Sequence, residues 1–294
     1  MRLPEWIKSA TRGPGMRQGP GSGQWQTHTI KHLFRSHRLL TVCEEAKCPN
    51  KMSCFSKPTA TFMVLGNVCT RACAFCAVGA GMPIAVDPDE PVKILEAARE
   101  MGLQYVVITS VTRDDLHDGG ASHFAAVIRN LRAGLSHVGI EVLTPDFKGD
   151  LAALKTVIEA APDVFNHNME TVRRLYSTIR PQADYGRSLD VLAAVKDMNC
   201  GIRTKSGFML GLGETVEEVE QLLYDLRSAG CDSLTIGQYL RPTKKNHPVV
   251  EYIIPEVFDE LKDKAIRLGF KGVASGPLVR SSMNAEELYK TIRN

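Results

Sequence analysis

The spacing of six cysteines constrains this chain more than any other feature of its sequence. Two triplets lie between residues 43 and 76: Cys43, Cys48 and Cys54 as C-x4-C-x5-C, then Cys69, Cys73 and Cys76 as C-x3-C-x2-C. Structural zinc takes four ligands, whereas three thiolates can hold a [4Fe–4S] cube and leave one iron open. The spacing therefore favours two iron–sulfur sites. A zinc site shared between the triplets remains the alternative.

Composition limits the other classes of function. The chain has 294 residues and a formal charge of +3, from 36 basic and 33 acidic side chains. So balanced a charge predicts no nucleic-acid partner. No apolar run is long enough to span a membrane, and the first residues lack the apolar segment of a signal peptide. We therefore expect a cytoplasmic protein without a membrane partner, in which clustered cysteines bind metal and do not form disulfides.

Strand-like and helix-like segments alternate six times after residue 60. The expected strands are 61–65, 104–110, 140–144, 163–168, 206–210 and 233–237, and the expected helices are 91–101, 122–133, 150–161, 188–198, 215–229 and 254–269. Such alternation predicts parallel strands joined by right-handed crossovers. We therefore expect an α/β fold, specifically a partial TIM-type (β/α)6 barrel. An open doubly wound sheet is the alternative.

Three regions are expected along the chain. Residues 1–58 would form an N-terminal extension with the first triplet, 59–253 the barrel, and 254–294 a C-terminal helical extension with a short strand and the RSSM segment. The two extensions are expected to cover the barrel mouth. Gly, Pro and Arg in residues 1–26 predict an extended or mobile arm, and 28–40 a short basic helix. The isolated Cys200 and Cys231 are expected to be small buried groups.

Polar clusters follow the expected strands, where a barrel of parallel strands places its chemistry. The second triplet follows the first strand, and Asn168 and Glu170 follow the fourth, with Asn166 and His167 beside them. Gly211 and Glu214 follow the fifth strand. Asn168 and Glu170 could be ordinary surface groups, but their position suits hydrogen bonds to a ligand at the mouth.

Two motifs resemble those of radical S-adenosylmethionine (SAM) enzymes. Phe75 stands before the last cysteine of the second triplet, as in the C-x3-C-x-aromatic-C signature of that superfamily. The run GFMLGLGE at 207–214 is similar to the G-x-I-x-G-x-x-E pattern, whose strand backs the adenine of SAM.

Over nearly its whole length the chain resembles the lipoyl synthase family. The matching segments are CEEAKCPN (43–50), TATFMVLGNVCTRACAFCAV (59–78), TSVTRDDLHDGGASHF (109–124), FNHNMETV (165–172), RPQADYGRSL (180–189), KSGFMLGLGE (205–214), IGQYLRPT (236–243) and ASGPLVRSSM (274–283). The C-x4-C-x5-C triplet directly ahead of the radical SAM triplet is the most specific of these features. The opening LPEWIK is similar to bacterial members.

This resemblance implies a sulfurtransferase that inserts two sulfur atoms, at C6 and C8 of an octanoyl chain on a lysine of a lipoyl carrier domain. It implies one [4Fe–4S] cluster on Cys69, Cys73 and Cys76 that binds and cleaves SAM. A sacrificial auxiliary [4Fe–4S] cluster on Cys43, Cys48, Cys54 and Ser282 would supply the sulfur. The residues implied to contact SAM are Phe75, Asn168, Glu170, Gly211 and Glu214.

The implied partners are octanoylated carrier domains of 2-oxoacid dehydrogenase E2 and glycine cleavage H proteins, a low-potential electron donor and a cluster-reassembly carrier. Met283 departs from the family, which usually has Tyr after the two serines, and the KKNHPV run (244–249) also differs. Two other classes remain open at this stage: a different radical SAM enzyme, such as a relative of biotin synthase, and a non-enzymatic electron carrier or zinc-bound regulator.

Overall fold

A single curved sheet of eight strands organises the chain, seen here in a computed structural model that describes residues 3–11, 23–54 and 59–293. Its order is β1-β2-β5-β6-β7-β8-β9-β10; β1 is antiparallel to β2, and the other strands are parallel to one another. The bounds are β1 Leu40–Thr41, β2 Thr59–Val64, β5 Tyr105–Ser110, β6 Gly139–Leu143, β7 Val164–Asn166, β8 Arg203–Leu210, β9 Ser233–Gln238 and β10 Gly272–Gly276. Among the described residues, no strand pairing joins β1 to β10, so the barrel is open.

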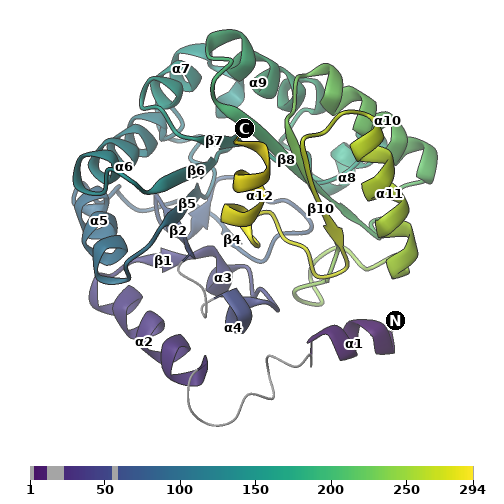
Figure 1. Cartoon of the computed structure of the whole chain (residues 1–294), viewed down its shortest axis with the longest axis horizontal. Helices are drawn as coiled ribbons and strands as arrows, with labels where there is room; N and C mark the ends of the chain where they lie inside the picture. Colours follow the sequence, from purple (N-terminus) through teal and green to yellow (C-terminus); the bar gives the residue numbers. More distant parts are fainter. Residues whose placement is uncertain (1–2, 12–22, 55–58, 294) are drawn as a thin grey trace.

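The crossover helices cover the outside of the curved sheet (Figure 1). They are α5 Glu90–Glu100, α6 Ala121–Gly134, α7 Leu151–Glu159, α9 Tyr185–Met198, α10 Val216–Ser228 and α11 Pro255–Arg267. Local sequence sets where several begin: Thr215 and Glu218 form a capping box at α10, and the Asp150 carboxylate caps α7. The sixfold alternation and the partial barrel expected from the sequence are confirmed.

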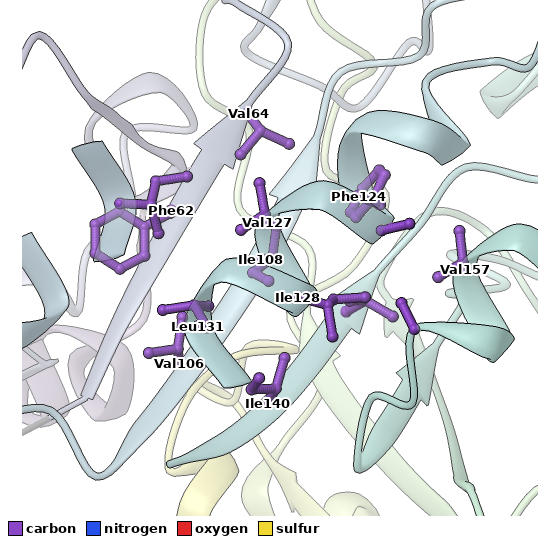
Figure 2. Packing of buried hydrophobic residues seen from close by; sticks show 14 of the residues in the cluster. Phe62, Val64, Val106, Ile108, Phe124, Val127, Ile128, Leu131, Ile140 and Val157 are labelled. Carbon is purple, nitrogen blue, oxygen red and sulfur yellow. The ribbon is translucent and has the colours of Figure 1, made fainter. Parts of the chain in front are cut away.

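Along each strand, side chains point alternately to the outside of the barrel and into its lumen, and these two sides differ in polarity. Outward side chains of β2, β5 and β6 are mostly apolar and form one buried cluster with side chains of the covering helices, as Ile108 does with Val127 and Ile128 of α6 in Figure 2. Inward side chains are mixed: Tyr105 and Glu141 are both about 1% exposed, inside the barrel. The outer layer therefore supplies the hydrophobic core, and the lumen is left for polar groups.

The C-terminal helix α12, Ala285–Ile292, lies inside the barrel (Figure 1). The Tyr289 ring packs on that of Tyr105 with centroids 5.7 Å apart. A Cβ built on Gly272 would lie 2.7 Å from the Ile292 side chain, so glycine there permits the close approach of the helix. Because Tyr105 and Gly272 begin their strands, α12 fills the amino-terminal half of the lumen. Residues 277–284 link it to the carboxyl end of β10.

The N-terminal region is more helical than expected. Helices α1, Glu5–Thr11, and α2, Gly23–Ser36, occupy parts of the stretch 1–26 that was expected to be extended, so that expectation is wrong there; residues 12–22 lie outside the described part. The basic helix expected at 28–40 is confirmed over residues 28–36 as part of α2; residues 37–38 form a turn and Leu40 begins β1. Phe34 stacks on Phe62 at 5.1 Å and attaches α2 to the sheet.

Three smaller observations complete the fold. Two short helices, α3 Val42–Glu45 and α4 Lys51–Cys54, precede β2, and short strands β3 Val68–Cys69 and β4 Gly79–Ala80 follow it. Cys231 is buried as expected, but Cys200 is exposed, because it follows the end of α9 in a turn at the surface. In the described part of the chain no helix has an apolar stretch long enough to cross a bilayer.

Candidate active site

One cavity of about 540 Å³ opens at the carboxyl ends of the strands. All six clustered cysteines line it, together with Ser282, Phe75, Asn168 and Glu170. The first triplet comes from α3, α4 and the turn between them, the second from the loop after β2, and Ser282 from the link between β10 and α12. Three segments that lie far apart in the sequence therefore share one site.

Backbone hydrogen bonds fold the first triplet locally. The Thr41 hydroxyl accepts from the Cys43 N–H at 3.3 Å, and the Cys48 N–H donates to the Cys43 carbonyl at 3.1 Å. Burial first, and the neighbouring Cys48 and Cys54 second, raise the pKa of the Cys43 thiol to about 12. Three thiols this close repel one another as thiolates, so the set fits a cationic iron centre that holds them deprotonated.

Contacts from two other loops hold the second triplet. The Cys69 sulfur accepts from the Arg71 and Thr112 N–H groups at 3.4 and 3.3 Å. The Asn246 amide donates to the Cys76 carbonyl at 2.6 Å, so the KKNHPV run supports this loop. Burial raises the pKa of the Cys76 thiol to about 12, with Cys73 and Cys69 adding to the shift and a backbone hydrogen bond from Val78 opposing it.

The thiols interact within each triplet. Cys43 is influenced by Cys48 and Cys54, whereas Cys73 and Cys76 are influenced by members of the second triplet. Over residues 3–11, 23–54 and 59–293, no three His, Cys, Asp or Glu side chains converge as a single metal ion requires. A four-iron cube needs no such convergence, because its cysteines bind different irons. The donor sets therefore fit two [4Fe–4S] clusters better than a shared zinc ion.

Two buried arginines place positive charge at the cavity wall. The Arg71 guanidinium donates to Asp114 at 2.7 and 2.9 Å and to Asp146 at 2.7 Å. Burial opposes the charged form of Asp146, but the Arg71 hydrogen bond and charge lower its pKa to about 2. Arg180 donates to the carbonyl oxygens of residues 168 and 169 at 2.9 and 3.1 Å. Both cations are held by the fold and oppose the negative charge that bound thiolates bring.

The structure brings Asn168 and Glu170 together at the end of β7. The Asn168 amide donates to the Glu170 carboxylate at 3.0 Å. Burial raises the pKa of Glu170, although the Arg180 charge and the Asn168 hydrogen bond oppose the shift. Glu170 has a φ of 66°, a left-handed conformation that is uncommon for a residue with a side chain and worth noting at a ligand site. Both residues face the cavity, as a ligand-binding role requires.

His167 also lines the cavity; the sequence placed it in the polar cluster after the fourth strand, but no ligand-binding role was predicted for it. It is 1% exposed, and its Nδ1 lies 2.9 Å from the Thr144 carbonyl, which fixes Nδ1 as the donor. Its Nε2 is buried, lacks a partner in the described residues and belongs to a side chain that lines the cavity. Burial first, and the Arg180 charge second, lower the pKa of His167 to about 4. The imidazole is therefore a neutral acceptor. Its position directly after a buried strand was the signal that could have identified it.

Gly211 and Glu214 do not line the cavity. The Glu214 carboxylate accepts from the N–H groups of Gly211 and Leu212 at 2.5 and 2.9 Å, which closes the turn after β8. Gly211 has a φ of +95°, and a Cβ there would lie 2.3 Å from the Gln238 amide. Both residues shape the strand end; direct contact with SAM stays a prediction for them.

The segment with Ser282 is fastened to the first triplet's side of the cavity. The Asn50 amide donates to the Leu278 carbonyl at 2.5 Å and to the Met283 sulfur at 3.3 Å. A Cβ on Gly237 would lie 2.3 Å from the Val279 carbonyl, so this glycine lets the segment cross the end of β9. Within the described residues, the Ser282 hydroxyl makes no hydrogen bond. It is therefore available to a ligand in the cavity.

Comparisons with known proteins agree with this geometry. The Radical SAM superfamily model matches residues 63–226. A lipoyl synthase of Caldicellulosiruptor saccharolyticus is 58% identical over 99% of each chain, and that of Caldicellulosiruptor bescii is 51% identical over 100% of this chain and 98% of its own. The lipoyl synthase of Rubrobacter xylanophilus is 53% identical over 99% of this chain and 87% of its own.

Solved structures share the fold at low identity. Methylornithine synthase superposes with a TM-score of 0.56 at 16% identity, covering 84% of this chain and 67% of its own. The hydrogenase maturase HydG gives a TM-score of 0.57 at 15% identity, covering 92% and 65%. These likenesses bear on the fold alone, whereas the curated relatives match this chain over nearly its whole length. On that full-length similarity, the chain belongs to the lipoyl synthase family of radical SAM enzymes.

Proposed function

We propose that this cavity is where the two sulfur atoms are inserted, at C6 and C8 of an octanoyl chain carried on a lysine of a lipoyl carrier domain. In this proposal Cys69, Cys73 and Cys76 hold the cluster that binds SAM. The auxiliary cluster is held by Cys43, Cys48, Cys54 and Ser282. The observation that carries the proposal is that all seven side chains line one cavity.

When bound, SAM and its cluster supply a carbon-centred radical that can break an unactivated C–H bond, and the auxiliary cluster supplies sulfur; side chains can do neither. The chain's own contribution is to hold these groups and the octanoyl carbon close together and to keep water out. Phe75, Met209 and Val279 add apolar surface to the cavity wall, which suits an alkyl chain.

In this proposal some polar residues of the cavity position SAM, and others set the charge around it and around the thiolates. Asn168 and Glu170 offer hydrogen bonds that suit the hydroxyls of a ribose. His167 offers an unprotonated Nε2 and so adds no positive charge beside a sulfonium ligand. Arg71 and Arg180 offset the negative charge of the thiolates.

Ser282 supplies an oxygen where the other ligands are thiolates. Oxygen is a hard donor and binds soft iron–sulfur sites more weakly than thiolate does. We infer that this weaker bond lets the auxiliary cluster give up sulfur during turnover. The same reasoning implies a carrier that rebuilds the cluster and a low-potential electron donor. Carrier domains of E2 and H proteins, in the cytoplasm, are the acceptors we propose.

The test is mass spectrometry of an octanoylated carrier-domain peptide after anaerobic incubation with the reconstituted protein, SAM and a low-potential reductant. Two added sulfur atoms per peptide are expected. A product without sulfur, despite SAM cleavage, would contradict the proposed activity.

Cysteine variants test the division of roles between the triplets. Replacing Cys69, Cys73 and Cys76 by Ala should remove about four irons and all SAM cleavage. Replacing Cys43, Cys48 and Cys54 by Ala should also remove about four irons but leave SAM cleavage in place, without sulfur transfer. Loss of both clusters from either triple variant would mean that the six cysteines form one shared site.

A further inference from the structure

A chain of hydrogen bonds, buried at its start and half-buried at its end, runs from the barrel lumen to the cavity. It begins at Glu141, whose carboxylate accepts from Lys205 at 2.9 and 3.2 Å and from the Tyr105 hydroxyl at 3.0 Å. All three side chains are about 1% exposed. The Asn166 amide also donates to Glu141, at 3.0 Å. Four separate contacts therefore fix the carboxylate inside the lumen.

The fixed carboxylate determines the direction of every later hydrogen bond. Asn166 must turn its NH₂ group toward Glu141, because its carbonyl oxygen would meet another acceptor there. The same NH₂ group lies 3.1 Å from the Ser281 hydroxyl oxygen, which is therefore an acceptor from Asn166. Ser281 then has its own proton free for a further partner.

That partner is Asn168. The Ser281 hydroxyl donates to the side-chain Oδ1 of Asn168 at 2.9 Å, and the Asn168 side-chain NH₂ group donates onward to the Glu170 carboxylate at 3.0 Å. The order Asn166, Ser281, Asn168, Glu170 thus has a single direction of donation. Each hydroxyl or amide in it is oriented by the group before it.

Ser281 connects these hydrogen bonds to the segment 277–284, which carries Ser282. Its neighbour Ser282 lies in the same turn, residues 281–284, and both serines line the cavity. We propose that Ser281 is a positioning residue: its hydrogen bonds hold Ser282 and the Asn168–Glu170 pair at fixed positions relative to each other. The inference rests on the proposed function, in which Ser282 faces the auxiliary cluster and Asn168 and Glu170 face SAM.

The experiment compares Ser281→Ala with Ser281→Thr, which keeps the hydroxyl, in the reconstituted full-length protein. In Ser281→Ala, amide hydrogen exchange over residues 277–284 should become about tenfold faster, because two hydrogen bonds of ordinary net strength are lost. Exchange in the outer helices, such as α6, should not change. Ser281→Thr should restore most of the protection.

Two further readouts separate positioning from general stability. In a Cys69/Cys73/Cys76→Ala background, which isolates the auxiliary site, Ser281→Ala should lose iron to a chelator about tenfold faster for the same reason. With all cysteines present, its KM for SAM should rise more than its kcat falls, because the Asn168–Glu170 pair is loosened and no group that reacts is removed.

The inference is overturned if Ser281→Ala matches the wild type in local exchange and iron retention, or if Ser281→Thr is as impaired as Ser281→Ala. Ser282→Ala separates this failure from that of the proposed function. If Ser282→Ala retains auxiliary iron normally, the ligand role of Ser282 is wrong, while the exchange result still decides whether Ser281 holds the segment.

Discussion

Replacing His167 by Gln should remove a pH-dependent part of the stability. The folded state holds His167 neutral because its pKa falls from 6.5 to about 4, by burial first and by the Arg180 charge second. The unfolded chain takes up a proton below about pH 6.5 that the folded chain refuses until about pH 4, so stability falls as pH is lowered through this window. At about 1.4 kcal/mol per pH unit, the shift corresponds to about 3 kcal/mol in total, of which about 2 kcal/mol appears between about pH 7 and pH 4.5.

The assay is urea unfolding of cluster-free protein at several pH values in that range. The free energy of unfolding of the wild type, relative to His167→Gln, should fall by about 2 kcal/mol from about pH 7 to pH 4.5, because other titrating groups cancel in the comparison. The amide of Gln can still donate to the Thr144 carbonyl, which limits unrelated damage. The same substitution at the exposed His32 is the matched control. A difference that stays constant across the range would refute the assignment of a buried, neutral imidazole.

Three other substitutions have defined outcomes. Ser282→Ala should leave SAM cleavage largely intact and reduce lipoyl formation at least tenfold, which corresponds to roughly 1.4 kcal/mol of barrier. Ser282→Cys should retain auxiliary iron longer, because thiolate is the softer ligand. Normal product formation by Ser282→Ala would exclude the ligand role. Lys205→Met should lower the free energy of unfolding by about 3–5 kcal/mol, because it leaves the Glu141 charge buried and unpaired. Adding Glu141→Leu should recover much of this loss. An unchanged urea midpoint in the single variant would contradict the buried ion pair. Asn246→Ala should speed the loss of iron from the second triplet in a Cys43/Cys48/Cys54→Ala background, because the Cys76 carbonyl loses its hydrogen-bond donor. The exposed Lys245→Ala is the control. Equal rates of iron loss in the two variants would contradict this prediction.

Much of the fold could be predicted from short-range sequence patterns. The capping box at Thr215, the glycine stops and the period of the apolar residues each depend on neighbours within a few positions, so the crossover helices could be predicted to within a few residues. The spacing within each cysteine triplet is equally local. By contrast, the helix over Glu5–Thr11 was hidden by the glycine-rich run that follows it, and Ile7 is 1% exposed only because tertiary packing buries it.

The sequence alone predicted the grouping of the cysteines into two triplets and the family that the chain resembles, because cluster ligation depends on residue types at short, fixed spacings. Tertiary structure decided the rest. It placed Ser282 in the same cavity as the first triplet, put α12 in the lumen, and joined Glu141, Lys205 and Asn166 across three strands. These contacts depend on strand register and on which face of each strand points inward, and one residue of register would reverse every such side chain. Residues far apart in the sequence therefore meet only once the sheet has curved.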